Sequence, residues 1–507
     1  MSFLERLFGS KKETTASSHT SVLSYHFEKY TDFGQIVLLF DFVLNPNDNI
    51  ALKAAETIHH LFVQKAVFES KQLYETFKYL RIDKSDITKF ERFPEHIKLT
   101  LLCIASLNAN GYSREAALEK LAKSTEENVF PFVLFRLADW VKPIRENAEQ
   151  IIREFISPVN AMLFIRNHKL ISWLITVERV DLSALYSEII DCITQTIIDW
   201  EKIKLLSDGQ RFFYIKSLIG KQALKTETID FILRDKYYLN RLLLIRYLDQ
   251  LDDGHSVLLK LITDKSHKVR LNAINWISDQ NLTEFRSFLE PLIFDSSSSI
   301  RFASRNLLNK IGTLDYRKLY KQSISEGKFL VGSIIGLSEI GDKSDMEIVS
   351  SYLKSEKPRV KSAALIGLYN LDNDLATELA YDILAHENPV NTKKVSELIL
   401  TKHGCNIRKL REIYDKTDYT GKKVILRLIN RFGGWSAAGD FLKTMTENDS
   451  SLVKLAEIYL FSWLKYTTRL GMKQSQEDKD YVMLWHRKAK IMNIKVSDTI
   501  PFIFGEK

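Results

Sequence analysis

Five basic residues recur along the chain in a pattern that could bind anions. Three of them stand six residues after an aspartate, in the pairs Asp139 and Arg145, Asp264 and Arg270, and Asp295 and Arg301. An arginine near the amino end of a helix is a common phosphate ligand, because its guanidinium forms paired hydrogen bonds and the helix dipole favours an anion. The candidate row is Arg145, Arg270, Arg301, Arg305 and Lys361.

A structural interpretation competes with anion binding, and we favour it. In this interpretation the turn aspartate and the arginine that opens the next helix pair between adjacent units and orient them. Asp264 and Asp295 would then neutralise the row, which would stabilise the fold and leave no ridge of free positive charge.

Residue types that carry catalysis or bind metals are sparse. His59 and His60 are adjacent, and adjacent side chains on a helix point about 100° apart. His403 and Cys405 form the other close cluster, and neither cluster has partners at the spacing of a metal site. No HExxH, GxSxG or GxGxxG motif occurs. We therefore predict no catalytic, cofactor-binding or metal-binding residues, no cofactor, and no enzyme activity.

The tryptophans could stack on nucleic-acid bases, but most occupy apolar helical positions, which favours core packing. They are Trp140, Trp173, Trp200, Trp276, Trp435, Trp463 and Trp485.

The amino terminus carries a short apolar face. Phe3, Leu4, Leu7 and Phe8 share one side of a two-turn helix that two lysines follow. Residues 1–12 could touch an anionic membrane or dock in a groove of a partner. Packing on the rest of the chain or plain disorder is the more ordinary interpretation, because two turns are marginally stable alone.

The elements that position these residues repeat along the chain. Helical segments open at positions 269, 300, 330, 360 and 452, and the fourth residue after each opening is small or aliphatic. Offsets of four and eight residues form the buried stripe of an α-helix. The period of 30–31 residues predicts further copies near positions 391 and 422, and earlier ones near 239 and 209.

Second amphipathic stretches at 284–294, 346–355 and 374–384 lie between these segments, so each period is a pair of short helices. A pair of this size cannot bury both faces alone, and stacking on its neighbours is obligatory. Gly312, Gly341 and Gly433 are expected to end second helices in the left-handed conformation. With 19 glycines and 9 prolines in 507 residues, the chain is poor in both, which excludes collagen-like and turn-rich all-β proteins.

The repeats resemble the HEAT and HEAT-like family, including the short bacterial class first named from phycobilisome lyases. The shared pattern is a turn aspartate, an aliphatic residue followed by a basic one, a small residue and a closing Ile-Gly. Its copies here are Asp264 with Val269-Arg270 and Ala273, Asp295 with Ile300-Arg301, Ser304 and Ile311-Gly312, Val360-Lys361 with Ala364, and Asp139 with Ile144-Arg145 and Ala148. Val331 and Val453 stand at two basic positions and interrupt the row.

The resemblance covers about residues 205–465 and implies an all-α fold, an α-α superhelix or HEAT-like solenoid. We expect an irregular helical region before the regular array and a capping helix after it, opened by Ser475 and Asp478. The predicted division is a flexible arm at 1–20, an irregular helical region with isolated copies at 21–204, the regular array at 205–466, and the cap and tail at 467–507.

HEAT-like folds serve scaffolds, transport receptors, nucleic-acid binders and a few enzymes, so the fold alone does not fix a function. We expect a non-catalytic scaffold or adaptor that holds a protein partner on its concave surface. The alternative is a HEAT-like nucleic-acid-binding protein, supported by the net charge of +8 and by the candidate row. A HEAT-like DNA glycosylase or another enzyme is a distant third.

The remaining expectations concern the compartment. Three widely spaced cysteines form no disulfide framework, which favours a reducing interior. The first residues lack the apolar core of a secretory signal, and no segment has the apolar length of a membrane helix. We therefore expect a cytoplasmic protein without a transmembrane segment, and only weak, non-specific binding to nucleic acid.

Overall fold

The computed structural model describes residues 27–505, apart from 65–69, 125, 197–198, 222–223, 279, 281, 387 and 467–473. The flexible arm predicted at 1–20 and the docking face of Phe3, Leu4, Leu7 and Phe8 lie outside the described residues, so both stay predictions. The described residues form helices and no strands.

The chain divides into two compact units, unit 1 at residues 1–240 and unit 2 at residues 241–507, and the division falls within helix α16. The domain boundaries predicted from the sequence stay predictions. The elements of unit 1 are η1 (Phe27–Lys29), η2 (Phe33–Gln35), α2 (Ile36–Val43), α3 (Asp48–Gln64), α4 (Ser70–Phe77), α5 (Asp86–Lys89), η3 (Phe90–Arg92), α6 (Glu95–Ala105), α7 (Gly111–Leu121), α8 (Phe130–Arg136), α9 (Lys142–Phe155), η4 (Pro158–Asn160), α10 (Ala161–Arg166), α11 (His168–Leu174), α12 (Ser183–Gln195), α13 (Trp200–Lys204), α14 (Asp208–Gly220) and α15 (Thr226–Arg234).

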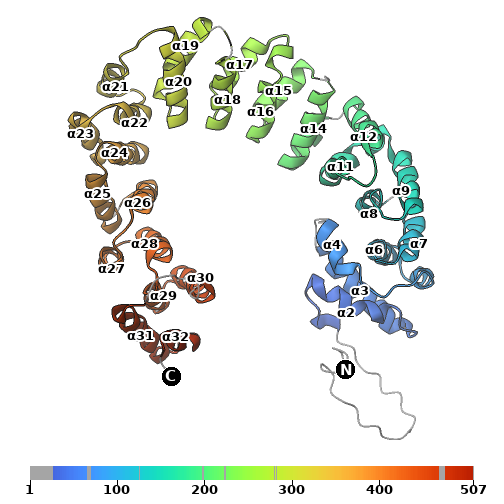
Figure 1. The fold of residues 1–507 in the computed structure, drawn as a ribbon. Coiled ribbons are helices and arrows are strands. Elements are labelled where there is room, and N and C mark those ends of the chain that lie inside the picture. Colours follow the sequence, from blue (N-terminus) through green and yellow to red (C-terminus); the bar gives the residue numbers. More distant parts are fainter. Residues whose placement is uncertain are drawn as a thin grey trace. The chain divides into compact units, whose positions relative to one another are not determined.

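Helix α16 (Tyr238–Ile245) leads into unit 2, whose helices run from yellow-green to red in Figure 1. Its elements are η5 (Leu248–Gln250), α17 (Gly254–Ile262), α18 (His267–Ile277), η6 (Leu282–Phe285), α19 (Arg286–Leu289), η7 (Glu290–Phe294), α20 (Ser298–Ile311), α21 (Tyr316–Ser325), α22 (Leu330–Ile340), η8 (Lys343–Asp345), α23 (Met346–Ser351), η9 (Tyr352–Lys354), α24 (Pro358–Leu371), α25 (Asn373–Ala385), α26 (Val390–His403), α27 (Ile407–Tyr414), α28 (Tyr419–Phe432), α29 (Ala437–Met445), α30 (Ser450–Tyr466), α31 (Gln476–Ile491) and α32 (Thr499–Ile503).

The predicted repeat is confirmed in unit 2. Helices α18, α20, α22, α24, α26, α28 and α30 begin close to the predicted positions, and each contacts the next along one side of the unit (Figure 1). The intervening helices, among them α21, α25, α27 and α29, form the other side. The stretch predicted at 284–294 is largely 3₁₀-helical, with Pro291 at the start of its last turn. The fold is an all-α, HEAT-like stack of helix pairs.

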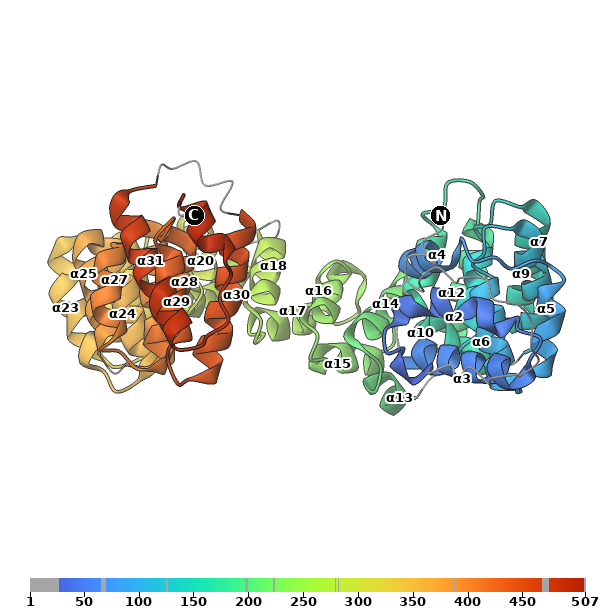
Figure 2. The same cartoon turned by 90° about the horizontal axis from the view of Figure 1, so that it is seen from below.

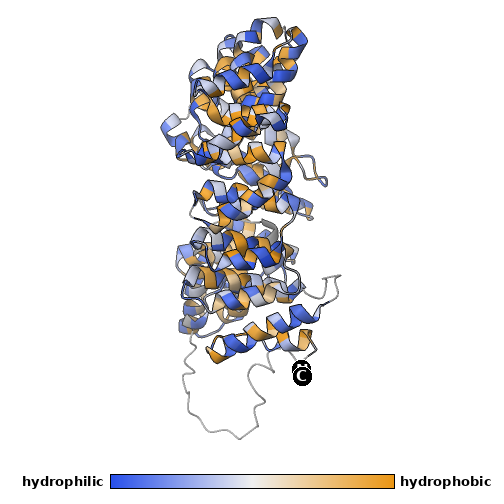
Figure 3. Cartoon of the chain, turned by 90° about the vertical axis from the view of Figure 1, so that its left-hand side faces the viewer, coloured by the Kyte–Doolittle hydropathy of each residue, from blue (hydrophilic) through white to orange (hydrophobic). Residues whose placement is uncertain are grey.

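The predicted register of the second helices is correct. The small or aliphatic residues four steps into five of these helices have no exposed area: Ala273, Ser304, Ile334, Ala364 and Ala456. Because positions four apart lie on one face of a helix, this face is the one pressed against neighbouring helices. Figure 3 shows hydrophobic and hydrophilic residues interleaved on the same helices, as expected where one stripe is buried.

The predicted capping helix is α31. The Ser475 hydroxyl accepts a hydrogen bond from the Asp478 amide, and the Asp478 carboxylate accepts one from the Ser475 amide, which is a complete capping box. Figure 2 shows α29, α30 and α31 together at the end of the chain, where α29 contacts both of the others. Phe504, which follows α32, packs against Trp435 and Trp463 and closes the apolar core.

The prediction of left-handed glycines is wrong at all three positions. Gly312 has φ of +159° and an extended ψ, a conformation that still favours glycine. Gly341 and Gly433 have negative φ values. A Cβ on Gly341 would lie 2.2 Å from a carboxylate oxygen of Asp345, so close packing and not backbone conformation requires glycine there.

In the part of the chain that the structure describes, no helix combines the length and apolar character needed to cross a bilayer.

Candidate functional site

The turn aspartates of unit 2 bind arginines of the preceding helix pair. Arg241 donates to both carboxylate oxygens of Asp264, at 2.5 and 2.9 Å. Arg270 donates in the same paired way to Asp295, at 2.8 and 2.7 Å. We call this series of contacts the Asp–Arg ladder. At these two boundaries it joins one helix pair to the next through a buried or nearly buried ion pair.

The arginine six residues after each aspartate binds its backbone carbonyl, not its carboxylate. Arg270 Nη1 lies 2.6 Å from the carbonyl oxygen of Asp264, and Arg301 Nη1 lies 2.6 Å from that of Asp295. Each carboxylate also accepts the backbone amide two residues later, from Ser266 or Ser297. One aspartate therefore closes its own turn and holds two arginines, one on each side of a repeat boundary.

Unit 1 repeats this arrangement. Arg114 binds both carboxylate oxygens of Asp139, at 2.8 and 2.7 Å, and Arg145 Nη1 binds the Asp139 carbonyl at 2.7 Å. Arg211 binds Asp235 at 2.9 and 3.1 Å. Burial opposes ionisation of both aspartates, but the hydrogen bonds and positive charges of these arginines outweigh it and lower the pKa of each carboxyl group.

Two arginines of the candidate row bind a glutamate that the spacing of the sequence pattern did not predict. Arg301 and Arg305 both bind the carboxylate of Glu339 in α22, and Arg305 also donates to the hydroxyl of Tyr320. Lys361 is the one candidate of the five whose side chain has no hydrogen-bond or ion-pair partner among the described residues. Four of the five therefore bind other groups of the protein.

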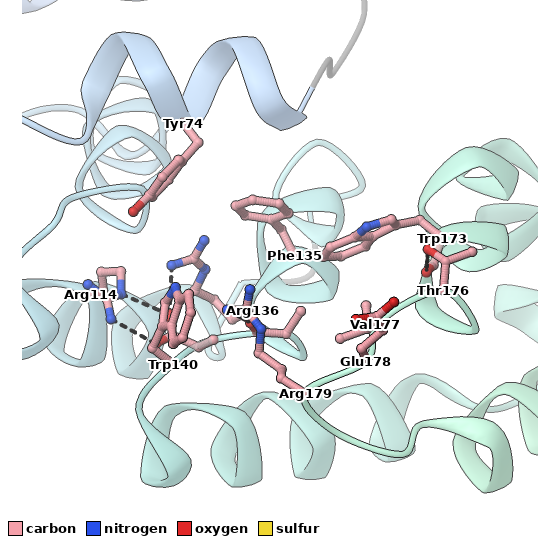
Figure 4. A pocket seen from close by; sticks show the side chains of 12 residues that line it. Tyr74, Arg114, Phe135, Arg136, Trp140, Trp173, Thr176, Val177, Glu178 and Arg179 are labelled. Carbon is pink, nitrogen blue, oxygen red and sulfur yellow. Dashed lines mark hydrogen bonds and ion pairs between the residues drawn. The ribbon is translucent and has the colours of Figure 1, made fainter.

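A second site lies entirely in unit 1, in a pocket of about 640 Å³ that we call the aromatic pocket. Side chains from α4, α7, α8 and α11 and from the turns before α9 and α12 surround it (Figure 4). Its lining consists of Tyr74, Arg114, Phe135, Arg136, Ala138, Asp139, Trp140, Trp173, Thr176, Val177, Glu178 and Arg179.

Trp140 stands at the mouth of this pocket with 76% of its surface exposed. The Arg179 guanidinium lies 3.9 Å from the centre of the indole ring and donates to the carbonyl of Ala138. Phe135 and Trp173 stack on each other with ring centres 5.4 Å apart. Tryptophan and arginine are enriched among the residues that dominate binding energy at protein interfaces.

Arg136 forms part of the pocket wall although only 3% of its surface is exposed. Its Nη1 donates to Asp139 at 2.8 Å, while its buried Nε has no acceptor among the described residues. Burial lowers the pKa of this guanidinium to about 10, against the opposing charge of Asp139, so it stays positive at neutral pH. Arg114 and Arg136 share the carboxylate of Asp139, and with Arg179 and Glu178 the lining carries three positive and two negative side chains.

A neighbouring pocket of about 510 Å³ lies on the other side of α11, and we call it the lysine pocket. His168, Ile175 and Phe212 contribute apolar and aromatic surface, and its charged lining residues are Lys216 and Lys221. Lys221 pairs with Asp191 at 2.6 Å, whereas Lys216 is exposed and has no ion-pair partner among the described residues. Trp173 of α11 lines the aromatic pocket, whereas His168 and Ser172 of the same helix line the lysine pocket, so the two pockets flank this helix.

The tryptophans and histidines considered in the sequence analysis lie in different parts of the structure. Trp435 and Trp463 are core residues as predicted, but Trp140 is not, because it stands in the turn before α9 and outside the buried stripe. His59 binds the hydroxyl of Thr100 at 2.8 Å. No group of three histidine, cysteine, aspartate or glutamate side chains in the described ranges is arranged to hold a metal ion.

Comparison with known proteins yields distant structural likenesses only. No family model matches the chain, and no curated protein matches it. A mutant of Kap121p is 13% identical with a TM-score of 0.31, and Kap121p bound to the extreme C-terminus of the protein phosphatase Cdc14p is 14% identical with a TM-score of 0.28; each match covers 82% of this chain and 55% of the other. Kap95p with RanGDP is 9% identical with a TM-score of 0.32, covering 92% of this chain and 65% of Kap95p.

The chain thus spans between about half and two thirds of the length of these proteins. At such TM-scores the likeness supports no functional conclusion, and the assignment of fold rests on the helix pairs of this chain.

Proposed function

We propose that the protein is a non-catalytic, HEAT-like scaffold or adaptor that binds a protein partner. The observation that carries this proposal is the aromatic pocket, where Trp140 is exposed beside three further aromatic side chains and a buried arginine. Tryptophan, tyrosine and arginine dominate the binding energy of protein interfaces, because they bury a large area and form directed contacts.

The Asp–Arg ladder supports protein binding over nucleic-acid binding. Binding to duplex DNA needs basic side chains that are free to neutralise phosphates. Arg270 and Arg301 instead bind Asp295 and Glu339, so they do not form an open basic ridge. We expect weak, non-specific DNA binding at physiological salt, with a dissociation constant no tighter than about 10⁻⁶ M.

The thiol chemistry supports a role without catalysis. Burial raises the pKa of Cys103 and Cys192, and it raises the pKa of Cys405 to about 11. A thiol with a raised pKa is a poor nucleophile at neutral pH, because the thiolate is the reactive form. A cytoplasmic location, which would keep these cysteines reduced, remains part of the proposal.

The test is affinity capture of the full chain from its native cells, with and without nuclease treatment. We expect the same captured proteins in both samples. The double variant Trp140→Ala, Arg179→Glu should lose them, and Phe461→Ala, which truncates an exposed aromatic residue of α30, should keep them. Capture of nucleic acid, or of proteins that nuclease removes, would favour the nucleic-acid-binding alternative.

A further inference from the structure

We propose that the surface across α11 binds an extended acidic peptide segment of the partner, with apolar side chains entering the aromatic pocket and the lysine pocket. This inference rests on the proposed function and names the chemistry of the partner at that site.

The first support is the unsatisfied guanidinium of Arg136. Two buried arginines face the single carboxylate of Asp139, and the buried Nε of Arg136 has no acceptor among the described residues. A buried charged donor without an acceptor is unfavourable, whereas a carboxylate supplies acceptors and balances the charge. Arg179, at the mouth of the same pocket, has no carboxylate partner in the described part of the chain. An acidic side chain of a bound peptide would supply a carboxylate to the guanidinium groups of Arg136 and Arg179.

The second support is the charge of the lysine pocket. Its lining includes Lys216 and Lys221 and no acidic residue, and Lys216 is free to pair with a carboxylate. Ile175 and Phe212 provide the apolar surface between these cations. Both pockets therefore combine positive charge with apolar walls, which is the complement of an acidic segment that also carries apolar residues.

The spacing of the pockets suits an extended chain. A helix with its side chains is about 10–12 Å wide, and an extended peptide advances about 3.3 Å per residue. Three to four residues of peptide would therefore cross α11 from one pocket to the other. The segment would place an apolar residue in each pocket and acidic residues beside Arg136, Arg179 and Lys216.

The same geometry disfavours a nucleic-acid strand. Bases stack on open aromatic faces. Arg179 covers one face of Trp140, and Phe135 and Trp173 stack on each other, so one face of each of these rings is already in use. The rings therefore offer a base fewer open faces than a free aromatic platform would.

The experiment is a fluorescence-anisotropy titration of the full chain with three labelled peptides. The first is Gly-Glu-Phe-Glu-Glu-Glu-Phe-Glu-Gly, in which the two phenylalanines are four residues apart and so share one face of an extended chain; the second has lysine for every glutamate, and the third has alanine for every phenylalanine. We expect the first to bind at least tenfold more tightly than either of the others. Equal or tighter binding of the lysine peptide would overturn the proposal, as would tighter binding of a labelled oligothymidylate strand.

Variants then locate the binding site. Trp140→Ala, Arg179→Glu and Lys216→Glu, all at exposed positions, should each weaken the acidic peptide at least fivefold. Phe461→Ala and Lys357→Glu, at exposed positions of unit 2, are the matched controls and should leave its binding unchanged. Unchanged affinity in the three pocket variants would refute the location.

The two proposals fail separately. If no peptide binds but capture of a partner still depends on Trp140 and Arg179, the acidic-peptide inference is wrong and the scaffold function stands. If neither peptide binding nor partner capture depends on these residues, both are wrong.

Discussion

Removing the carboxylate of Asp295 is the sharpest perturbation of the Asp–Arg ladder. The Asp295→Ala substitution deletes both hydrogen bonds from Arg270 and the bond from the Ser297 amide. Arg270 keeps its contact with the Asp264 carbonyl but loses the only carboxylate that balances its charge among the described residues. The side chains of Arg270 and Asp295 are 12% and 10% exposed, so solvent screens their attraction weakly.

The expected cost follows from this geometry. A hydrogen bond to a charged group contributes about 1.5–3 kcal/mol, and leaving one member of a buried ion pair alone costs about 3–5 kcal/mol. We expect Asp295→Ala to lower the free energy of unfolding of unit 2 by about 3–5 kcal/mol. Unit 2 spans residues 241–507, close to the upper end of the range of about 150–250 residues in which each kcal/mol changes Tm by about 2–4 °C, so the transition should fall by about 6–20 °C.

Thermal unfolding followed by far-UV circular dichroism measures this shift. The double variant Arg270→Met, Asp295→Ala should recover part of the loss, because it removes the uncompensated charge. Glu477→Gln is the control: it breaks the pair with Arg408, whose side chains are 74% and 68% exposed, and should cost at most about 1 kcal/mol. If Asp295→Ala melts within the error of the control, the ladder does not hold the repeats together.

Three further predictions concern packing, acid stability and charge. Ala364→Glu places a carboxylate at a position with no exposed area and should destabilise unit 2 by several kcal/mol in urea unfolding, whereas Leu398→Glu, at an exposed position of α26, should change it by at most about 0.5 kcal/mol. The pKa values of Asp139 and Asp235 are lowered by folding, so the stability they supply is present above about pH 4 and is lost as the pH falls through their folded-state values; Tm measured against pH should fall there, and less steeply in Asp139→Asn. Labelled duplex DNA titrated at two salt concentrations should bind no tighter than about 10⁻⁶ M at physiological salt, and sub-micromolar, salt-steep binding would contradict the ladder's neutralisation.

The helix pairs could be predicted from the sequence because their signal is local. A small residue four steps into a helix is the mark of a buried stripe, and Ala273 and Ala364 lie on that stripe as predicted. The capping box of Ser475 and Asp478 is likewise a local signal, because it depends on four consecutive residues. Such short-range patterns predict the structure well, because each helix pair packs against neighbouring pairs of the same kind.

The partners of the basic residues could not be predicted in full. Glu339 lies 38 residues after Arg301 and stands in a helix that lacks the Asp–Arg pattern, so only folding brings the two together. The sequence predicts core packing for most of the tryptophans without saying which are the exceptions, and the turn that holds Asp139 directs Trp140 outward. The aromatic pocket therefore depends on α4, α8 and α11 meeting, which no local pattern encodes.

Site-specific photocrosslinking at the surface across α11 tests the proposed function most directly. Ile175, which is 57% exposed and lines the lysine pocket, would be replaced by p-benzoylphenylalanine, with the same replacement at the 56% exposed Ile458 of α30 as the control. Irradiation in native cells should give a protein adduct at position 175 that is absent at position 458 and is lost when Trp140→Ala and Arg179→Glu are added. An adduct that nuclease digests, or identical adducts at both positions, would contradict a protein-binding scaffold that uses this surface.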